Sequence, residues 1–327
     1  MASLTAAPLD VTADVVEAVT DDRPFGGRCR IVLRNDGGRY ATLPPQIKAV
    51  AELRVSPGYV TAGGPQVSDG PAYWIESIER RSIKGEATLV LEGRDAWSLL
   101  EQWVARRQYN WAAGERNVFG ILQFLFARAG LEFSSAGSSS TAADHYPAFT
   151  VHPGDSGLTA VRRLLATVPD VVFARGEFAF LTEPLATEAT DYAYGTDHAL
   201  LAGRYADDTP PANRAQVFGN AVFGERFDWA GVQAVYDRLR QVDDRNLTTV
   251  AQAETRADTV LRAAAVAGMS GEITVSVNCG QELYDVIEVT DPASGLAAAR
   301  RRVLGVAMRY TTGERAVYEQ RISLAAP

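Results

Sequence analysis

The sequence predicts an α+β protein that is mainly β, with two small β-barrel domains flanking a middle α/β domain. Short runs of β-branched and aromatic residues between turn signals occupy both ends of the chain, and apolar residues at helical spacing occupy the stretch between them. The length of 327 residues suits two or three domains. With 46% hydrophobic and 22% charged residues, the composition is that of a soluble globular protein and excludes disorder and collagen.

The N-terminal region is predicted to contain strands at residues 29–34, 50–55, 73–81 and 86–93. Residues 82–85 form the turn of an antiparallel hairpin between the last two strands, and the second of these carries a β-forming run at 87–91. Turn residues at 35–38 and 56–58 end the first two strands. Several short strands with turns between them indicate a small barrel or sandwich.

The middle region changes to a helical period after Asp95, which is expected to cap the first helix. Trp97, Leu100 and Val104 share one face of that helix. A second helix starts near residue 115 and ends at Gly130, and its apolar residues occupy nearly every face, so we expect it to be buried nearly all round.

The rest of the middle region contains a loop, a helix and a strand pair. Residues 134–143 are small and polar and predict a flexible exposed loop, which is the expected site of proteolytic cleavage. Asp155 is expected to cap the next helix, and strands at 171–174 and 178–181 follow it around Arg175 and Gly176.

The C-terminal region is predicted to be a second β domain with one long helix inserted. Strands are expected at residues 200–206, 215–219, 272–277, 283–290, 301–309 and 317–324. The helix spans residues 249–268, and Thr249 with Gln252 forms a capping box at its start. These patterns divide the chain into a first β-barrel domain (1–96), a middle α/β domain (97–196) and a second β-barrel domain (197–327).

Charge and rare residue types exclude several functions. The formal charge of −8 gives no basic footprint for nucleic acid. Cys29 and Cys279 have no neighbouring ligands, which excludes zinc ribbons and disulfide frameworks and predicts two small buried side chains. Three histidines leave little material for His-based catalysis. Residues 1–18 lack the basic start of a signal peptide, and no apolar run could span a membrane, so we expect synthesis in a cytoplasm.

Few motifs suggest chemistry. Gly154-Asp155-Ser156-Gly157 matches a string found around some serine nucleophiles, but its position favours a helix start. The acidic pairs at 21–22, 207–208 and 243–244 are expected in loops, as solvated acids and, alternatively, as paired carboxylates for glycoside hydrolysis or a cation. The sequence holds no phosphate loop or dinucleotide fingerprint, so we predict no catalytic, cofactor-binding or metal-binding residues and no enzyme activity.

Arginines and tryptophans invite two further interpretations. The run Arg300-Arg301-Arg302 is expected to be a solvated strand start, with an acidic partner surface as the alternative. Three tryptophans, at positions 97, 103 and 111, are expected to pack the N-terminal barrel against the helices, with stacking on sugars as the alternative.

Segments at both ends resemble the baseplate hub proteins of phage tails. Residues 73–80 and 89–96 resemble the end of the first barrel of that family, and residues 157–165 with 171–182 are similar to its middle domain. Residues 213–219 resemble the opening of the second barrel, and residues 249–268, 272–275, 283–291, 303–306 and 318–320 resemble the rest of it. The resemblance covers most of residues 10–324 and depends on the order and spacing of degenerate β patterns.

This resemblance implies a homotrimer in which two barrels per subunit alternate around a ring. The ring would adapt a hexameric tail tube, or a distal tail protein, to a central trimeric spike or tip, within a virion tail or a related injection particle. DNA would pass through the lumen without specific binding, past a lining that the acidic balance makes negative. Because only residues 325–327 follow the last strand, we expect no fused lysozyme, peptidase or spike.

Two other functions remain as alternatives. A cell-wall-degrading hydrolase would use acids such as Asp207 or Asp208. A carbohydrate-binding tail module would use exposed Trp111 or Trp229 as stacking surfaces. For the fold itself, Leu283 is predicted to lie in the core of the second barrel, so that Leu283→Asp would destabilise it.

Overall fold

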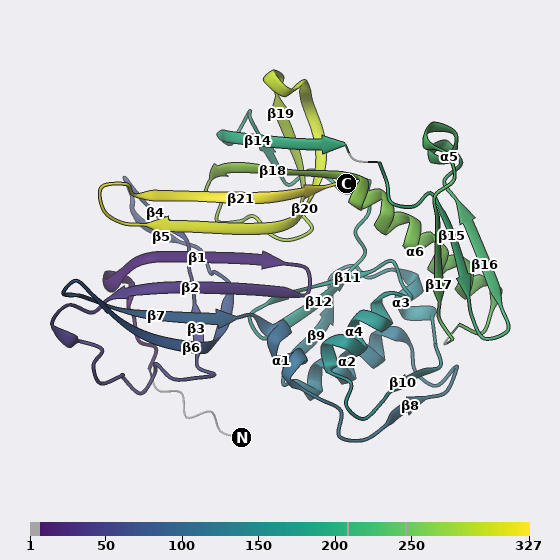
Figure 1. Cartoon of the computed structure of the whole chain (residues 1–327), viewed down its shortest axis with the longest axis horizontal. Helices are drawn as coiled ribbons and strands as arrows, with labels where there is room; N and C mark the ends of the chain where they lie inside the picture. Colours follow the sequence, from purple (N-terminus) through teal and green to yellow (C-terminus); the bar gives the residue numbers. More distant parts are fainter. Residues whose placement is uncertain (1–6, 208, 246) are drawn as a thin grey trace.

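A large antiparallel sheet dominates the fold (Figure 1). The structure is a computed structural model that describes residues 7–207, 209–245 and 247–327. Within these residues the sheet has 11 strands. Along its main path they are β14 (Leu200–Asp207), β18 (Met269–Ser276), β21 (Val317–Ala325), β20 (Leu296–Thr311), β1 (Val15–Arg23), β2 (Gly26–Arg34), β7 (Glu86–Arg94), β6 (Ala72–Ile83) and β3 (Glu52–Arg54). β19 (Val286–Asp291) pairs with β20, and β13 (Tyr192–Tyr194) pairs with β19.

Strand β1 joins the two ends of the chain. It pairs with β2 on one side and with β20 on the other, where Val19 lies opposite Arg309 and Asp21 lies opposite Ala307. The sequence predicted no strand here, and it assigned the strands at the two ends to separate units. The structure therefore confirms a mainly β chain, and it places strands from both ends in one large antiparallel sheet.

The predicted hairpin at residues 73–93 is confirmed as β6 and β7. Lys84 and Gly85 form its turn with φ values of 53° and 89°, the left-handed pair that a two-residue hairpin loop requires. Strands β2 and β3 confirm two more predicted strands. A second hairpin, β4 (Gly58–Thr61) with β5 (Gly64–Val67), was not predicted, and 3₁₀ turns lie at Thr12–Asp14, Asp36–Gly38 and Pro292–Ser294.

The middle region is an α/β unit below the large sheet in Figure 1. Its helices are α1 (Ala96–Gln102), α2 (Val118–Arg128), α3 (Ser140–Asp144) and α4 (Gly157–Leu165), and its strands are β8 (Tyr109–Trp111), β10 (Phe149–Val151), β9 (Glu132–Ser135), β11 (Val171–Arg175) and β12 (Phe178–Thr182). Trp97 packs edge-on against Phe25 and Phe126, which ties the large sheet to the helices. As predicted, Asp95 caps α1, Gly130 follows α2 in a left-handed conformation, and α2 is buried except along a stripe that includes Gln123.

Three predictions for the middle region were wrong in detail. Helix α1 ends before Val104, which is exposed. The N-cap of α4 is Ser156 instead of Asp155, whose carboxylate accepts from the N–H of His152 and pairs with Arg163. Residues 134–143 are mostly ordered in β9 and α3, because Ser139 caps α3 and its hydroxyl and N–H donate to the buried Asp170 carboxylate. The predicted exposed loop therefore shrinks to the turn at residues 136–138.

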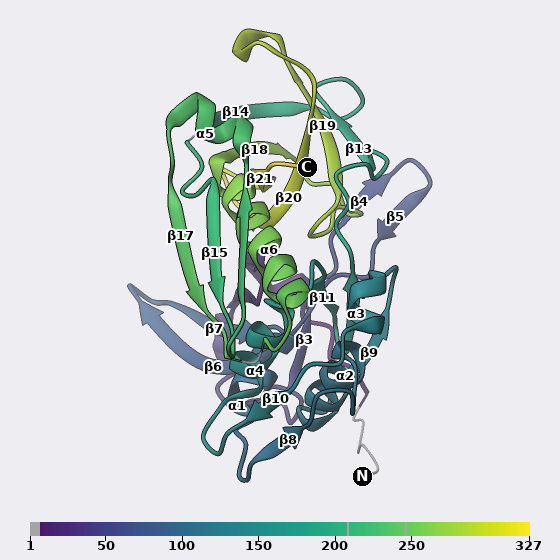
Figure 2. The same cartoon turned by 90° about the vertical axis from the view of Figure 1, so that its right-hand side faces the viewer.

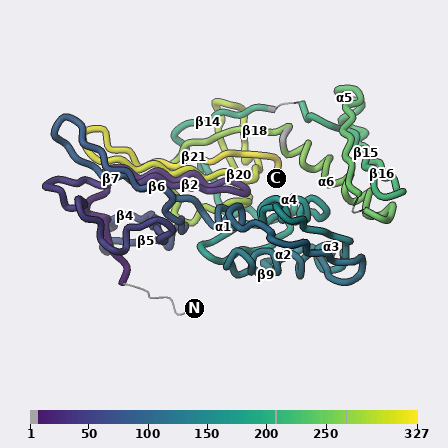
Figure 3. Tube along the Cα trace, turned by 60° about the horizontal axis from the view of Figure 1, so that its bottom comes forward, coloured from purple at the N-terminus to yellow at the C-terminus, as the bar shows by residue number. Residues whose placement is uncertain are grey.

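A separate lobe interrupts the C-terminal strands. It consists of β15 (Arg214–Phe218), β16 (Phe223–Phe227), β17 (Leu239–Asp243), α5 (Trp229–Val235) and α6 (Val250–Gly268). The capping box of Thr249 and Gln252 is present at the start of α6. Residues 215–219 do not open a second barrel as predicted, because β15 pairs only with β16 and β17, apart from the large sheet. Figures 2 and 3 show this lobe beside the large sheet and the helices.

The C-terminal strands of the large sheet have their own core. Fully buried side chains from β18, β19, β20 and β21 fill it, together with Tyr194: Ile273, Val275, Ile287, Val289, Val303 and Ile322. Leu283 was wrongly placed in this core, since it precedes β19 and is only partly buried against the cluster.

Candidate functional site

The large sheet has one packed face and one open face. Ile31, Leu33 and Leu89 point to the packed face and are buried. The alternating positions on the same strands include the exposed Arg28 and Arg34, and also Val32 and Val90, which are buried. This alternation continues through β1, β20, β21 and β18, because the register stays in phase across the sheet apart from local bulges. The open face is therefore one continuous surface that both ends of the chain build.

Charges of both signs cover the open face. The register places there the arginines 23, 28, 30, 34, 81, 94, 204, 309 and 321 and the acids Glu17, Asp21, Glu79, Glu86, Glu92, Glu272 and Glu319. Arg30 pairs with Glu17 at 2.5 Å, and Arg81 pairs with Glu79 at 2.7 Å. Since arginines outnumber carboxylates, the net negative charge of the chain is located elsewhere.

Over the described residues, the main path of the sheet ends at β14 and β3, and a side branch ends at β13; β14 and the part of β6 that β3 does not cover are open edges. β14 pairs only with β18, and β6 beyond Ile75 pairs only with β7 over the residues that the structure describes. Leu201 on β14 is 58% exposed. Backbone N–H and C=O groups on such edges are available for pairing with another chain.

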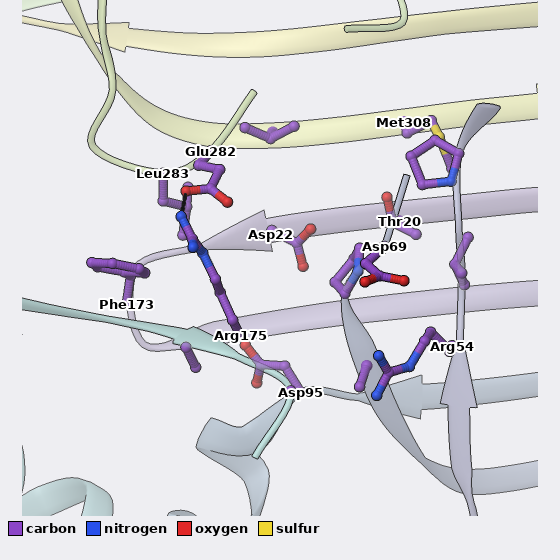
Figure 4. A pocket seen from close by; sticks show the side chains of 18 of the residues that line it. Thr20, Asp22, Arg54, Asp69, Asp95, Phe173, Arg175, Glu282, Leu283 and Met308 are labelled. Carbon is purple, nitrogen blue, oxygen red and sulfur yellow. Dashed lines mark hydrogen bonds and ion pairs between the residues drawn. The ribbon is translucent and has the colours of Figure 1, made fainter. Parts of the chain in front are cut away.

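A cavity of about 320 Å³ lies where the sheet, the middle unit and the segment before β19 meet (Figure 4). Arg175, from the β11–β12 turn, reaches across it to pair with Glu282. Carboxyl groups line its walls, including Asp22 of β1, Asp69, and Asp95 at the start of α1. Three parts of the fold therefore supply its polar side chains.

Asp22 and Asp95 face each other across Gly27. A Cβ atom at Gly27 would lie 2.6 Å from Asp22 Oδ1 and 2.8 Å from Asp95 Oδ2, so both carboxyl oxygens crowd the space that the glycine leaves open. Tyr73 donates its hydroxyl to Asp22 Oδ1 at 2.8 Å, and Asp95 Oδ1 accepts from the N–H of Trp97. Both groups are hydrogen-bonded although they are largely withdrawn from water.

Burial dominates the electrostatics of this pair. Loss of solvation raises the pKa of Asp22 to about 7, against the hydrogen bond from Tyr73, and the charge of Asp95 raises it further. Loss of solvation also raises the pKa of Asp95 to about 7, against its backbone hydrogen bonds. Burial likewise raises the pKa of the Cys29 thiol to about 12. Burial therefore favours the protonated form of both carboxyl groups.

Neither a metal-ligand cluster nor the predicted serine string is part of this cavity in the described part of the chain. Over the described residues, no group of three or more His, Cys, Asp or Glu side chains is arranged to hold a metal ion. Ser156 is not among the residues that line the cavity, and its hydroxyl accepts from the N–H of Thr159 as the cap of α4. The interpretation of residues 154–157 as a helix start is confirmed.

The predicted acidic pairs lie in different places from those expected. Asp21 and Asp22 lie near the C-terminal end of β1, with Asp21 on the open face and Asp22 inside, so they were wrongly assigned to a loop. Asp207 ends β14 and Asp243 ends β17, while Asp208 lies outside the described residues. The structure thus brings Asp22 and Asp95 together and places Asp21 and Asp22 on opposite faces of β1.

The arginine run is not a solvated strand start. Arg302 is buried and donates to Glu188 at 2.7 Å and to the carbonyl oxygens of Tyr284 and Leu185, and Arg300 donates to the carbonyl of Glu188. These bonds fasten the segment that enters the C-terminal half of the chain.

Aromatic and sulfur side chains divide between core and surface. Trp97 and Trp111 are buried and Trp103 is partly buried in the core of the middle unit, as the packing interpretation predicted, so Trp111 is no exposed stacking surface. Trp229 is 62% exposed. Cys29 is buried as predicted, whereas Cys279 is only partly so.

Sequence reasoning missed the Asp22–Asp95 pair. A signal was present, because Ala18, Thr20 and Asp22 alternate with Val19 and Asp21 as strand positions do. The facing of the two acids depends on the register of β1, β2 and β7, which the sequence does not specify locally.

Comparison with solved structures identifies the fold. A 43 kDa tail protein of prophage MuSo2 from Shewanella oneidensis is similar with a TM-score of 0.70 and 14% identity, covering 96% of this chain and 94% of that one. The tail protein from Neisseria meningitidis is similar with a TM-score of 0.72 and 14% identity, covering 95% of this chain and 92% of that one. A type VI secretion component of Escherichia coli is similar with a TM-score of 0.61 and 14% identity, covering 96% of this chain and 74% of that one. The chain therefore has the fold of phage tail proteins, over nearly its whole length.

Sequence comparisons add no relative. No protein-family model matches the chain, and no curated protein matches it. Among the described residues, no helix is both long and apolar enough to cross a membrane.

Proposed function

We propose that this chain is the structural hub of a phage tail tip or baseplate. Three copies would form a pseudo-sixfold ring that adapts a hexameric tail tube or distal tail protein to a trimeric spike or tip. The fold of phage tail proteins supports a structural role in a tail, and a virion or related injection particle is its expected location. The similarity to tail proteins also supports a structural, non-enzymatic role.

The observation that carries this proposal is the continuous sheet with an edge at each end. β14 at one end and β6 at the other belong to different halves of the chain, so a second copy can place its β6 edge against β14 of the first. Such a contact is head-to-tail, and it closes into a ring when the rotation between copies fits. Each subunit would then contribute its N-terminal and C-terminal strands in turn, which is the alternation that pseudo-sixfold symmetry needs.

Two finer features belong to the same proposal. We keep the division into domains 1–96, 97–196 and 197–327, with the reservation that β1 and β20 connect the outer two. If the open face lines the lumen, DNA passes a surface of mixed charge, because arginines outnumber carboxylates there. The expected negative lining gains no support from this face.

Electron microscopy and light scattering of the purified chain test the ring. We expect threefold particles, and we expect Leu201→Lys on β14 to lower the assembled fraction because a charge on an edge strand opposes pairing. Leu185→Lys is the matched control, since Leu185 is 46% exposed and lies in a connecting segment away from any strand edge. A wild-type chain that stays monomeric at high concentration and in the presence of tail tube would refute the proposal.

A further inference from the structure

The three-stranded sheet of the separate lobe has one uncovered face. Ala215 and Val217 of β15 are fully buried against α6, so Arg214, Gln216 and Phe218 point to the opposite side. Figure 2 shows α6 along only one side of these strands. The register places three rows of side chains on the uncovered face: Leu239–Arg214–Phe227, Gln241–Gln216–Glu225 and Asp243–Phe218–Phe223. We call these nine residues, together with Trp229, the platform.

The central row of the platform is a chain of hydrogen bonds. Gln241 Nε2 donates to Gln216 Oε1 at 2.9 Å, and Gln216 Nε2 donates to Glu225 Oε1 at 2.7 Å. Arg214 lies between Glu225 and Asp237, with 2.8 Å to each carboxylate. The charges at this point are therefore paired internally, and the second N–H of each amide remains for a ligand.

Aromatic side chains stand at both ends of this polar row. Trp229 stacks on Phe227 with ring centres 4.4 Å apart and an angle of 8°, and 62% of Trp229 is exposed. At the other end, the ring centres of Phe218 and Phe223 are 5.2 Å apart, and 39% of Phe218 and 44% of Phe223 are exposed. Four residue steps along β15 separate the two ends, which is about 13 Å.

We propose that the platform binds a neutral oligosaccharide. A sugar ring has an apolar face of C–H groups that stacks on aromatic rings, and its hydroxyls bond to planar amides and carboxylates. Arg214 is paired with two carboxylates, so this cluster has no positive charge left for an anionic ligand. A protein interface has an apolar centre and a polar rim, whereas the platform has a polar centre and apolar ends. The distance between those ends matches a few sugar rings.

Titration of the whole chain with three neutral hexasaccharides tests the proposal: maltohexaose, cellohexaose and chitohexaose. Calorimetry and tryptophan fluorescence are the measurements. We expect at least one sugar to bind with a Kd between about 1 μM and 1 mM. Trp229→Ala and Phe218→Ala, at opposite ends, should each weaken that binding at least about tenfold. Phe178→Ala is the control, because Phe178 is 44% exposed on β12 in the middle unit.

Four outcomes would overturn the proposal. The first is that none of the three sugars binds at about 10 mM, far above the expected range. The second is binding that Trp229→Ala, Phe218→Ala and Phe178→Ala change equally. The third is binding of dextran sulfate in place of the neutral sugars, which would make the platform an anion site. The fourth is loss of ring assembly in Trp229→Ala without sugar binding by the wild type, which would make the platform a protein interface.

Discussion

Replacing Asp22 by asparagine should make the protein more stable at neutral and alkaline pH. The carboxyl of Asp22 lies beside Asp95 on the cavity wall, where the residue is partly exposed, and loss of solvation raises its pKa from 3.8 to about 7. The fold therefore favours the protonated form, while the unfolded chain favours the ionised form. Asparagine has the same shape, keeps an oxygen to accept the hydroxyl of Tyr73, and has no charge to bury.

The size of the effect follows from linkage. A raised pKa stabilises the fold fully below the ordinary value of 3.8, and this stabilisation is lost as the pH rises toward about 7. Of the interval from about pH 5 to pH 8, roughly two pH units lie below the raised pKa of Asp22, and over each of them the free energy of unfolding of wild type falls by about 1.4 kcal/mol through this group. The free energy of unfolding of Asp22→Asn, relative to wild type, should thus increase by about 3 kcal/mol over this interval. Any fixed cost of packing the amide is the same at both pH values and cancels.

Urea unfolding at the two pH values measures this difference through the transition midpoint. Asp21→Asn is the control, because Asp21 lies next door on the open face in an ion pair with Arg23 at 2.8 Å, and exposed pairs contribute under about 1 kcal/mol. Other acids with a raised pKa, such as Asp285, are present in wild type and in both variants, so their contribution to the pH dependence cancels when each variant is compared with wild type. If Asp22→Asn destabilised the protein equally at both pH values, Asp22 would be ionised in the fold and the reasoning would be wrong.

Two further predictions concern the C-terminal strands. Gly195→Ala should lower the free energy of unfolding by more than about 2 kcal/mol, because its Cβ would lie 1.9 Å from the carbonyl oxygen of Thr290 at a φ of 90°. Gly313→Ala should lower it by only about 1 kcal/mol, because Gly313 has a φ of 100° but open space around it. Equal losses of stability in urea unfolding would remove the steric argument. Ile287→Asp should prevent folding at ordinary temperatures by burying an unpaired charge, and Leu283→Asp should leave a folded protein with a lower midpoint. Circular dichroism distinguishes the two, and a folded Ile287→Asp would show that the core is assigned to the wrong residues.

Features that depend on neighbouring residues were predictable from the sequence. The hairpin of β6 and β7 has alternating side chains and a turn at Lys84 and Gly85 that specifies its own geometry. The capping box of Thr249 and Gln252 likewise depends on positions three residues apart. In both cases local preference and tertiary structure agree.

Features that depend on distant pairing were missed. β17 has exposed residues at four of its five positions, so it lacks the apolar alternation that marks a strand, and its pairing with β15 gives it its structure. β1 places Asp22 at an inward position, which breaks the expected pattern of apolar residues inside. The burial of Arg302 was missed for the same reason. An arginine run predicts exposure, but the guanidinium of Arg302 donates to the carbonyl oxygens of Leu185 and Tyr284, which are distant in the sequence. The site depends on these same distant pairings.

The pairing of β1 with β20 also has a consequence for assembly. Residues near position 20 contact residues near position 308, so the large sheet cannot be completed until almost the whole chain has been synthesised. Before that point β1, β2, β7 and β6 can already pair, because β1 precedes β2 in the chain, and this smaller sheet offers β1 as an unpaired edge. The pairing of β20 with β1 covers that edge and joins the C-terminal strands, including β14, to the same sheet. If β14 and β6 join copies into a ring, a chain holds both edges in one sheet only after this last pairing, so an unfinished chain cannot occupy a full place in the ring.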